Sequence, residues 1–226
     1  MSVALQTATP PAGLTLSAAT LTALGSALTT NVVQDSLNGV NGTIGWNFNL
    51  ADRLADGLGA GQVLTLAYLV TVRDSAAAVV TQTVTVRIVG TNDAAVIAGM
   101  ATANLTETNA VQSASGQLTA SDVDGAATFV AQANVLGAGG YGRFSITSAG
   151  AWTYTMATAH NEFVAGSTYT DSFTVTTADG TSRVVSVNMV GTNDAAVIVG
   201  TATGTVVEAG AAGAGTPTVG ATLTAT

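Results

Sequence analysis

The chain has 226 residues and a formal net charge of −8, with 13 acidic residues against 5 basic ones. This charge disfavours a nucleic-acid or anionic-membrane partner and suits a protein that binds divalent cations. The sequence contains no Cys and no Lys, which excludes a disulfide framework, thiolate chemistry and a lysine nucleophile. The mean hydropathy is +0.46, but no apolar run reaches the roughly 18 residues of a membrane span, so we expect no membrane insertion.

Residues 1–42 form the least regular part of the chain. Leu21, Leu24 and Leu28 follow one another at spacings of three and four, which predicts one short helix near residues 18–28. The N-terminus lacks a basic segment followed by an apolar core, so it does not have the pattern of a signal peptide. We expect either a piece of a longer protein or export through a signal elsewhere.

The middle of the chain alternates apolar and polar residues as strands do. Residues 43–50 carry Ile44, Trp46, Phe48 and Leu50 at every second position, and residues 64–72 and 84–88 alternate in the same way. Period-two alternation predicts half-buried antiparallel strands. Trp152 occupies the position in the second half that Trp46 has in the first, and we expect both indoles in a sandwich core.

One heptapeptide, Gly-Thr-Asn-Asp-Ala-Ala-Val, occurs at Gly90–Val96 and again 101 residues later at Gly191–Val197; we call it the seam. A fixed period of this length is that of one β-sandwich domain in a tandem array. The sequence therefore predicts an all-β fold of tandem immunoglobulin-like β-sandwich repeats. We expect the back part of a first repeat at 1–91, a complete second repeat at 92–192, and the first strands of a third at 193–226.

Five oxygen-bearing residues are candidate metal ligands. Two seam residues, Asn-Asp, enter the second repeat, and an Asp-x-Asp turn and one Glu lie within it; the set is Asn92, Asp93, Glu107, Asp122 and Asp124. Ca²⁺ takes six to eight oxygen ligands, and loops at one end of a sandwich can supply them. The alternative is that Asp122–Gly125 is a β-turn with solvated carboxylates and that Asn92 and Asp93 cap a linker turn.

One further aspartate and the residues around the last seam are weaker candidates for calcium ligands. Asp171 has Leu66 as its counterpart in the first repeat, so it is not part of the basic repeat pattern. The last seam brings Asn193, Asp194 and Glu208 but no Asp-x-Asp. Any second site is therefore incomplete within this sequence.

The chain offers little catalytic equipment. His160 is its one histidine, and we expect it in a surface loop. The sequence has no Gly-x-Ser-x-Gly elbow, and Asp122 and Asp124 lie too close together to flank a glycosidic bond. We therefore predict that the protein is not an enzyme. An adhesion module that binds sugar or protein would instead need an exposed loop aromatic, for which Tyr141 and Phe163 are the candidates.

Several motifs together resemble the VCBS-type repeats of large bacterial surface adhesins, which are related to cadherin-like modules. They lie at residues 90–97, 105–107, 121–125, 141–146, 151–155 and 169–180. The resemblance implies an immunoglobulin-like β-sandwich, an extracellular location at the cell surface or in a secreted matrix, and calcium near domain junctions. Where the family usually has Ala-Pro, this chain has Ala94-Ala95, which implies a less stiff linker.

These patterns predict a structural repeat of an extracellular adhesin or matrix fibre that acts as a calcium-stiffened spacer. The alternative function is a carbohydrate- or protein-binding adhesion module. The expected partners are neighbouring repeats or copies of the chain itself. Residues 201–226 supply the first strands of a repeat and residues 1–89 the back of one, so the tail of one copy could complete the head of the next and build a filament. The simpler alternative is a window cut from a continuous array.

Overall fold

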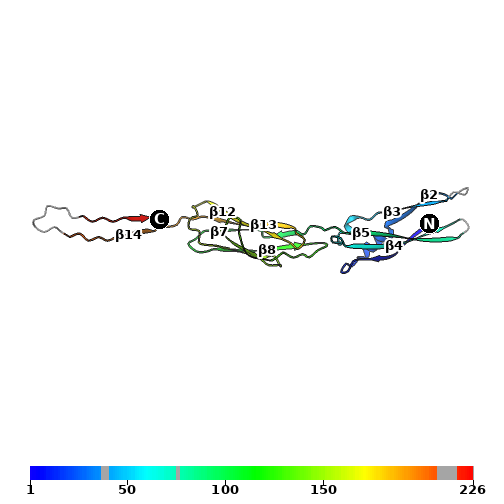
Figure 1. The fold of residues 1–226 in the computed structure, drawn as a ribbon, viewed down its shortest axis with the longest axis horizontal. Helices are drawn as coiled ribbons and strands as arrows, with labels where there is room; N and C mark the ends of the chain where they lie inside the picture. Colours follow the sequence, from blue (N-terminus) through cyan, green and yellow to red (C-terminus); the bar gives the residue numbers. More distant parts are fainter. Residues whose placement is uncertain (37–40, 75–76, 208–217, 226) are drawn as a thin grey trace, which may run out of the picture.

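A computed structural model describes residues 1–36, 41–74, 77–207 and 218–225. Strands dominate, as predicted, and they fall into three parts along an elongated molecule (Figure 1). We call residues 1–91 the first unit, residues 92–192 the second unit and residues 198–225 the C-terminal hairpin. The first unit and the hairpin lie at opposite ends, with the second unit between them. Within the described residues, no helix is long and apolar enough to cross a membrane.

The first unit is built from two small sheets and one helix. Its three-stranded sheet has the order β1-β4-β5, and its two-stranded sheet pairs β2 with β3. The elements are β1 (Ser2–Thr9), α1 (Ala18–Ala27), β2 (Leu28–Gln34), β3 (Thr43–Phe48), the 3₁₀ turn η1 (Asp52–Leu54), β4 (Val63–Arg73) and β5 (Val79–Val89). The helix predicted near residues 18–28 is confirmed, and the Ser17 hydroxyl caps it by accepting the Thr20 N–H at 3.0 Å.

The first core forms where α1 packs over β4. Leu64, Leu66 and Tyr68 are buried on one face of β4, as the alternation predicted. The Tyr68 hydroxyl donates to the Leu24 carbonyl at 2.7 Å, which ties the sheet to the helix. Burial of the phenol raises the pKa of Tyr68.

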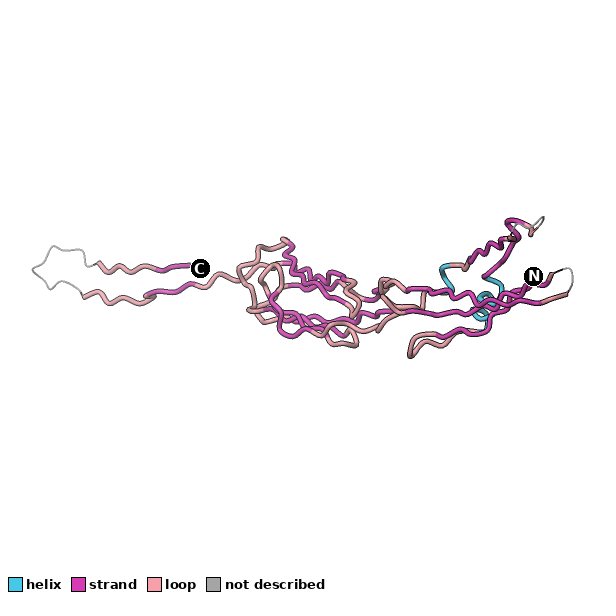
Figure 2. The backbone as a smooth tube through the Cα atoms, turned by 45° about the vertical axis from the view of Figure 1, so that its right-hand side comes forward, coloured by secondary structure: helices cyan, strands magenta, loops and turns pink. Residues whose placement is uncertain are grey.

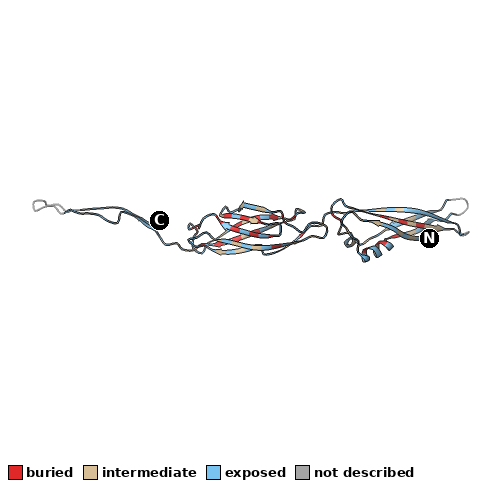
Figure 3. Ribbon diagram, turned by 90° about the horizontal axis from the view of Figure 1, so that it is seen from below, coloured by how far each residue is buried: buried red, intermediate tan, exposed pale blue. Residues whose placement is uncertain are grey.

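The second unit is a sandwich of a five-stranded and a three-stranded sheet. The sheet orders are β6-β8-β11-β10-β9 and β12-β13-β7, and β7 runs parallel to β13. The strands are β6 (Val96–Gly99), β7 (Thr102–Thr106), β8 (Ser113–Ser121), β9 (Gln132–Leu136), β10 (Gly142–Ile146), β11 (Ala151–Met156), β12 (Thr168–Thr176) and β13 (Ser182–Val190). Figure 3 shows the buried residues gathered along these strands.

The core of the second unit is more completely enclosed than that of the first. The inward positions of β13, Val185, Val187 and Met189, are fully buried. Trp152 on β11 is also fully buried, and its indole N–H donates to the Met100 carbonyl at 2.7 Å. A buried indole is well accommodated only when its N–H finds such a partner.

The prediction that Trp46 lies in a core is wrong. Its side chain is 54% exposed, whereas that of Trp152 is 0% exposed. The reason lies in the number of neighbouring strands. β11 pairs with β8 on one side and β10 on the other, whereas among the described residues β3 pairs only with β2, so about half of the Trp46 indole stays exposed.

The C-terminal hairpin pairs β14 (Ile198–Gly200) with β15 (Leu223–Ala225). Its two limbs run side by side (Figure 2), and all of its described residues are exposed. Within the described residues, these two strands pair only with each other. The hairpin is thus a strand pair without a core.

The seam begins with glycine because the chain backbone passes very close to it. A Cβ at Gly90 would lie 2.1 Å from the Leu58 carbonyl oxygen, and one at Gly191 would lie 2.4 Å from that of Val164. Real Cβ atoms do not approach that closely. In each unit, the loop before the penultimate strand, β4 or β12, therefore packs against the first residue of a seam.

The different burial of the two tryptophans gives a test of this fold. Trp152→Ala should destabilise the second unit by about 3–5 kcal/mol, because it removes a large buried side chain. Trp46→Ala, the matched control, should cost less than about 1 kcal/mol in dilute protein. Calorimetry of the two unfolding transitions measures both, and equal losses would contradict the packing described.

Candidate metal centres at the ends of the second unit

The structure divides the five predicted ligands between two places. Asn92, Asp93, Asp122 and Asp124 gather where the first seam enters the second unit. Glu107 follows β7, and its N–H donates to the carbonyl of Val190 at 2.8 Å, at the end where β13 runs into the second seam. The structure therefore does not bring Glu107 to the other four.

At the first junction, backbone hydrogen bonds hold the carboxylates in place. The Asp93 N–H donates to Asp124 Oδ2 at 3.0 Å, which joins the seam to the Asp-x-Asp turn. Asp122 Oδ1 accepts the N–H groups of Asp124 and Gly125 at 3.1 and 2.7 Å. The turn predicted at residues 122–125 is present, but Asp122 and Asp124 are partly buried rather than fully solvated.

Each of these two aspartates keeps one carboxylate oxygen buried without a partner, namely Asp122 Oδ2 and Asp124 Oδ1. Burying a carboxylate oxygen costs free energy unless a donor or a cation compensates it. In the described residues only two other buried side-chain oxygens lack a partner, and they belong to Glu107 and Asp194. All four thus lie at the ends of the second unit.

The first unit adds oxygen-bearing side chains to the first junction. Asp52, Asp56 and Asp93 line a hollow of about 90 Å³ together with the start of the seam. Gly59 lies against Asp124, since a Cβ there would be 3.2 Å from the Asp124 carbonyl oxygen. Asp52 and Asp56 were missed from the sequence because they precede the seam by more than thirty residues.

At the second junction, Glu107 is the central residue. Its side chain is 1% exposed, and its Oε2 accepts the N–H and the hydroxyl of Thr192 at 3.1 and 2.6 Å. Its Oε1 and Asp194 Oδ2 are buried without partners. Asp194 has the place in the second seam that Asp93 has in the first, a correspondence that the repeat makes visible.

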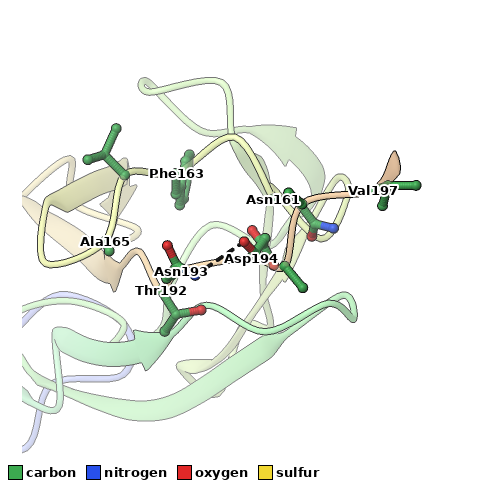
Figure 4. A pocket seen from close by; sticks show the side chains of 10 residues that line it. Asn161, Phe163, Ala165, Thr192, Asn193, Asp194 and Val197 are labelled. Carbon is green, nitrogen blue, oxygen red and sulfur yellow. Dashed lines mark hydrogen bonds between the residues drawn. The ribbon is translucent and has the colours of Figure 1, made fainter. Parts of the chain in front are cut away.

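A hollow of about 570 Å³ adjoins this junction and is lined by the second seam and the loop of Asn161 and Phe163. Figure 4 shows Thr192, Asn193 and Asp194 along one side of it and Asn161 on the facing loop. Asn161 stands five residues before Gly166, as Asp56 stands five before Gly61. The same offset from aligned glycines therefore brings an oxygen-bearing side chain to each junction.

Neither junction forms a complete cage from acidic side chains. Among the described residues, no three His, Cys, Asp or Glu side chains form a group that could hold a metal ion. Asn92 and Asn193 each donate their side-chain amide to the carbonyl of the next residue, at 2.9 and 3.2 Å. This leaves their amide oxygens as further hard ligands. Glu208, the last acidic candidate, lies outside the described residues.

The comparison with protein families concerns the second unit. Residues 92–191 match the family model of the bacterial cadherin-like domain. The second unit is a cadherin-like repeat. Cadherin-like domains are extracellular adhesion modules rather than enzymes.

Among solved structures, one similar chain is described as "Crystal structure of the Protocadherin GammaB4 extracellular domain". The TM-score is 0.38 and the identity 15%, over 88% of this chain and 29% of that chain. This chain thus spans less than a third of the protocadherin chain. A search of curated proteins finds no match.

In this cadherin-like repeat, Asp171 has a structural role instead of the metal-binding role considered from the sequence. Its side chain is fully buried and accepts the backbone N–H groups of Gly139, Tyr141, Gly142 and Ser172 at 2.8–3.1 Å. The Tyr154 hydroxyl also donates to it at 3.2 Å. With both oxygens occupied by donors, Asp171 holds the glycine-rich turn between β9 and β10.

Asp179 fixes the first seam of the cadherin-like repeat from the opposite sheet. Its Oδ2 accepts the N–H of Ala95 at 2.9 Å, and both of its oxygens accept from Thr181. Hydrogen bonds from Thr177 and Thr181 hold the pKa of Asp179 well below its ordinary value. The Ala95 N–H is therefore used, and a proline at this position would lose that bond.

His160 lies in the loop between β11 and β12, as predicted, but the prediction that it is a surface residue is wrong, because its side chain is largely buried. Its ring stacks on Phe163 at a centroid distance of 4.8 Å and meets Tyr141 edge-on at 5.6 Å. Phe163 is buried and also stacks on Tyr169 at 3.8 Å. Tyr141 and Phe163 are thus packed against other rings, and neither is the exposed loop aromatic that the alternative function predicts.

Both ring nitrogens of His160 face acceptors. Nδ1 lies 2.6 Å from Glu162 Oε1, and Nε2 lies 2.7 Å from the Tyr141 carbonyl oxygen. Only the protonated imidazole donates from both nitrogens. Burial lowers the pKa of His160, but the hydrogen bonds to Glu162 and Tyr141 outweigh it and leave this pKa raised.

A raised folded-state pKa means that this contribution to stability is fully present below pH 6.5 and is lost as pH rises through the folded pKa. The second unit should be more stable at pH 5.5 than at pH 8, by less than about 1 kcal/mol because solvent screens the exposed Glu162. His160→Phe keeps the ring stacking and should remove most of the difference. Thermal unfolding at the two pH values measures this, and an unchanged pH dependence in the variant would contradict it.

Proposed function

We propose that this protein is a structural spacer of an extracellular adhesin or matrix fibre, stiffened by calcium at its domain junctions. The observation that carries the proposal is the location of the four unpartnered carboxylate oxygens. They belong to Asp122 and Asp124 at one end of the cadherin-like repeat and to Glu107 and Asp194 at the other.

The donor set fits a hard cation such as Ca²⁺. The assigned groups are carboxylates, side-chain amides and backbone carbonyls, all of them oxygen ligands. At the first junction we assign Asn92, Asp93, Asp122 and Asp124 as the residues that would hold the ion. At the second we assign Glu107, Asn193 and Asp194. Water and the neighbouring unit would supply the remaining ligands that Ca²⁺ requires.

The position of these residues explains how an ion would stiffen the chain. Asp93 belongs to the seam, Asp124 to the body of the second unit, and Gly59 of the first unit touches Asp124. A cation bound by both aspartates would tie the linker to the domain and limit rotation between units. The absence of the Ala-Pro pair leaves this linker more dependent on such a tie.

A structural role also accounts for the two buried titratable side chains away from the junctions. His160 and Asp171 are committed to packing and hydrogen bonding within the repeat, so we infer no enzymatic activity. The aromatic residues considered for ligand binding are packed against one another. These contacts favour a spacer over a carbohydrate- or protein-binding module.

We extend the proposal to assembly: copies associate head to tail through residues 201–226, with the tail of one completing the first unit of the next. The exposed C-terminal hairpin and the exposed Trp46 support it. Because the hairpin and the first unit, which carries Trp46, lie at opposite ends of the molecule (Figure 1), the contact is heterologous and propagates as a filament.

Calcium should stabilise the cadherin-like repeat in a way that depends on named carboxylates. For a site with a dissociation constant of about 10⁻⁴ M, a hundredfold excess of calcium adds about 2.7 kcal/mol. This should raise the melting temperature by about 10 °C relative to a chelator. Asp124→Asn should abolish the part due to the first junction, and Glu107→Gln the part due to the second.

Asp74→Asn is the matched control, because it removes the same charge in the turn between β4 and β5, away from both junctions. It should leave the calcium response unchanged. A melting temperature that is the same in chelator and in 10 mM calcium, about a hundredfold over such a site, would contradict the stiffening proposal.

A further inference from the structure

The first unit lacks two strands that complete the second. In the second unit, β13 is paired on both sides, by β12 and by β7, and β11 lies between β8 and β10. In the first unit, the counterpart of β13 is β5, which pairs only with β4. The counterpart of β11 is β3, which pairs only with β2. Among the described residues, one edge of β5 and one edge of β3 thus have no neighbour.

The burial of side chains follows from these missing strands. Val84, Val86 and Ile88 of β5 are half-buried, whereas their counterparts on β13 are fully buried. Between the two sheets of the first unit lies a largely apolar hollow of about 150 Å³, lined by Ile44, Trp46 and Val84 among others. The open edges therefore border an incompletely filled core.

The C-terminal hairpin contains the two missing strands in a matching arrangement. Gly200 lies opposite Leu223 and Val199 opposite Thr224, just as Gly99 lies opposite Leu118 and Ala98 opposite Thr119. Both glycines have positive φ, and a Cβ on either would lie 2.4 Å from a carbonyl oxygen of the paired strand. The hairpin is therefore a preformed copy of the β6–β8 pair, with residues 203–207 in the place of β7.

We propose that the hairpin of one copy inserts into the first unit of another, with residues 203–207 added parallel to β5 and residues 218–225 added antiparallel to β3. This specifies the contact behind the head-to-tail assembly proposed above, on which it rests. It closes both sheets at once, because the β7 and β8 positions lie in different sheets. Strand addition of this kind gains main-chain hydrogen bonds and buries alternate side chains.

The second unit defines the register. Met189 pairs with Leu105 on the parallel ladder, which places Ile88 opposite Val206 and Arg87 opposite Thr205. On the other sheet, Trp152 pairs with Gly116, which places Trp46 opposite Ala221. A Cβ at Gly116 would lie 2.6 Å from the Trp152 ring, so the Trp46 indole must tilt away to admit the Ala221 methyl.

The segment that we expect at the open edges of β5 and β3 is the C-terminal hairpin of a second copy. The donor strands lie at the far end of the rod from the open edges (Figures 1 and 2), so one chain does not fill its own first unit. Insertion would also let the second seam lead into a completed unit, as the first seam does.

Engineered cysteines test the register, since the natural chain contains none. Asn188 and Asn104, the counterparts of Arg87 and Thr205, have side chains in contact at 3.1 Å. In the full chain, Arg87→Cys with Thr205→Cys should therefore form intermolecular disulfides on mild oxidation and give a ladder of multimers. Arg87→Cys with Thr203→Cys, two residues out of register, is the control and should give at least tenfold less.

Substitutions at two adjacent, exposed residues of the inserting hairpin, Val206 and Val207, test the insertion without disturbing the monomer. Val206, 50% exposed, would face the acceptor core like Leu105, whereas Val207, 82% exposed, would face solvent like Thr106. In sedimentation velocity, the wild-type chain should form polymers that grow with concentration. Val206→Asp should remain monomeric and Val207→Asp should polymerise as the wild type does.

The outcomes separate the two proposals. A wild-type chain that stays monomeric at all concentrations, with its open edges unfilled or filled only by another protein, overturns head-to-tail assembly itself. Polymers that cross-link equally in both cysteine pairs, or that tolerate Val206→Asp, overturn the strand insertion while leaving assembly in place. Repeating the series in chelator keeps either result distinct from calcium binding at the junctions.

Discussion

A strand of a β-sandwich buries its inward side chains fully only when neighbouring strands flank it on both edges, and this constraint explains the difference between the two units. In the second unit, β7 and β8 supply the second neighbours of β13 and β11, and Met189 and Trp152 are then fully buried. The first unit has the same central strands without those neighbours, and its Trp46 is exposed. The difference between the two units is therefore one of strand number and not of core chemistry.

The second constraint is electrostatic and operates where units meet. Each junction places carboxylate oxygens in a buried position without a hydrogen-bond donor, although threonine and backbone N–H groups satisfy the companion oxygens of Glu107, Asp122 and Asp124. The Asp-x-Asp turn accepts a hydrogen bond from the seam that precedes the second unit, and Glu107 accepts one from the seam that follows it. In a tandem array, every junction would then receive ligands from both of the units that it joins, which is how one ion could order two domains.

The sequence predicted local structure well and long-range burial less well. The helix of residues 18–27, the face of β4 and the seam could be predicted because each depends on short-range periodicity or on exact repetition. The exposure of Trp46 could not, since it depends on a neighbouring strand of β3 that is missing among the described residues of the first unit. The sequence pattern places Glu107 with Asp122 in loops at one end of a sandwich, but β7 runs parallel to β13 and carries Glu107 to the other end. The roles of Asp171 and His160 also depend on distant loops, which periodicity does not describe.

Closure of the first unit by a second copy is the central claim, and the two tryptophans allow it to be measured directly in the unmodified chain. Trp152 is fully buried within the second unit, so the fluorescence that acrylamide can quench comes from Trp46. If the hairpin of a neighbouring copy covers β3, the quenchable fraction should fall as protein concentration rises, in step with the increase in polymer mass. A quenchable fraction that stays constant while polymers form would contradict the claim.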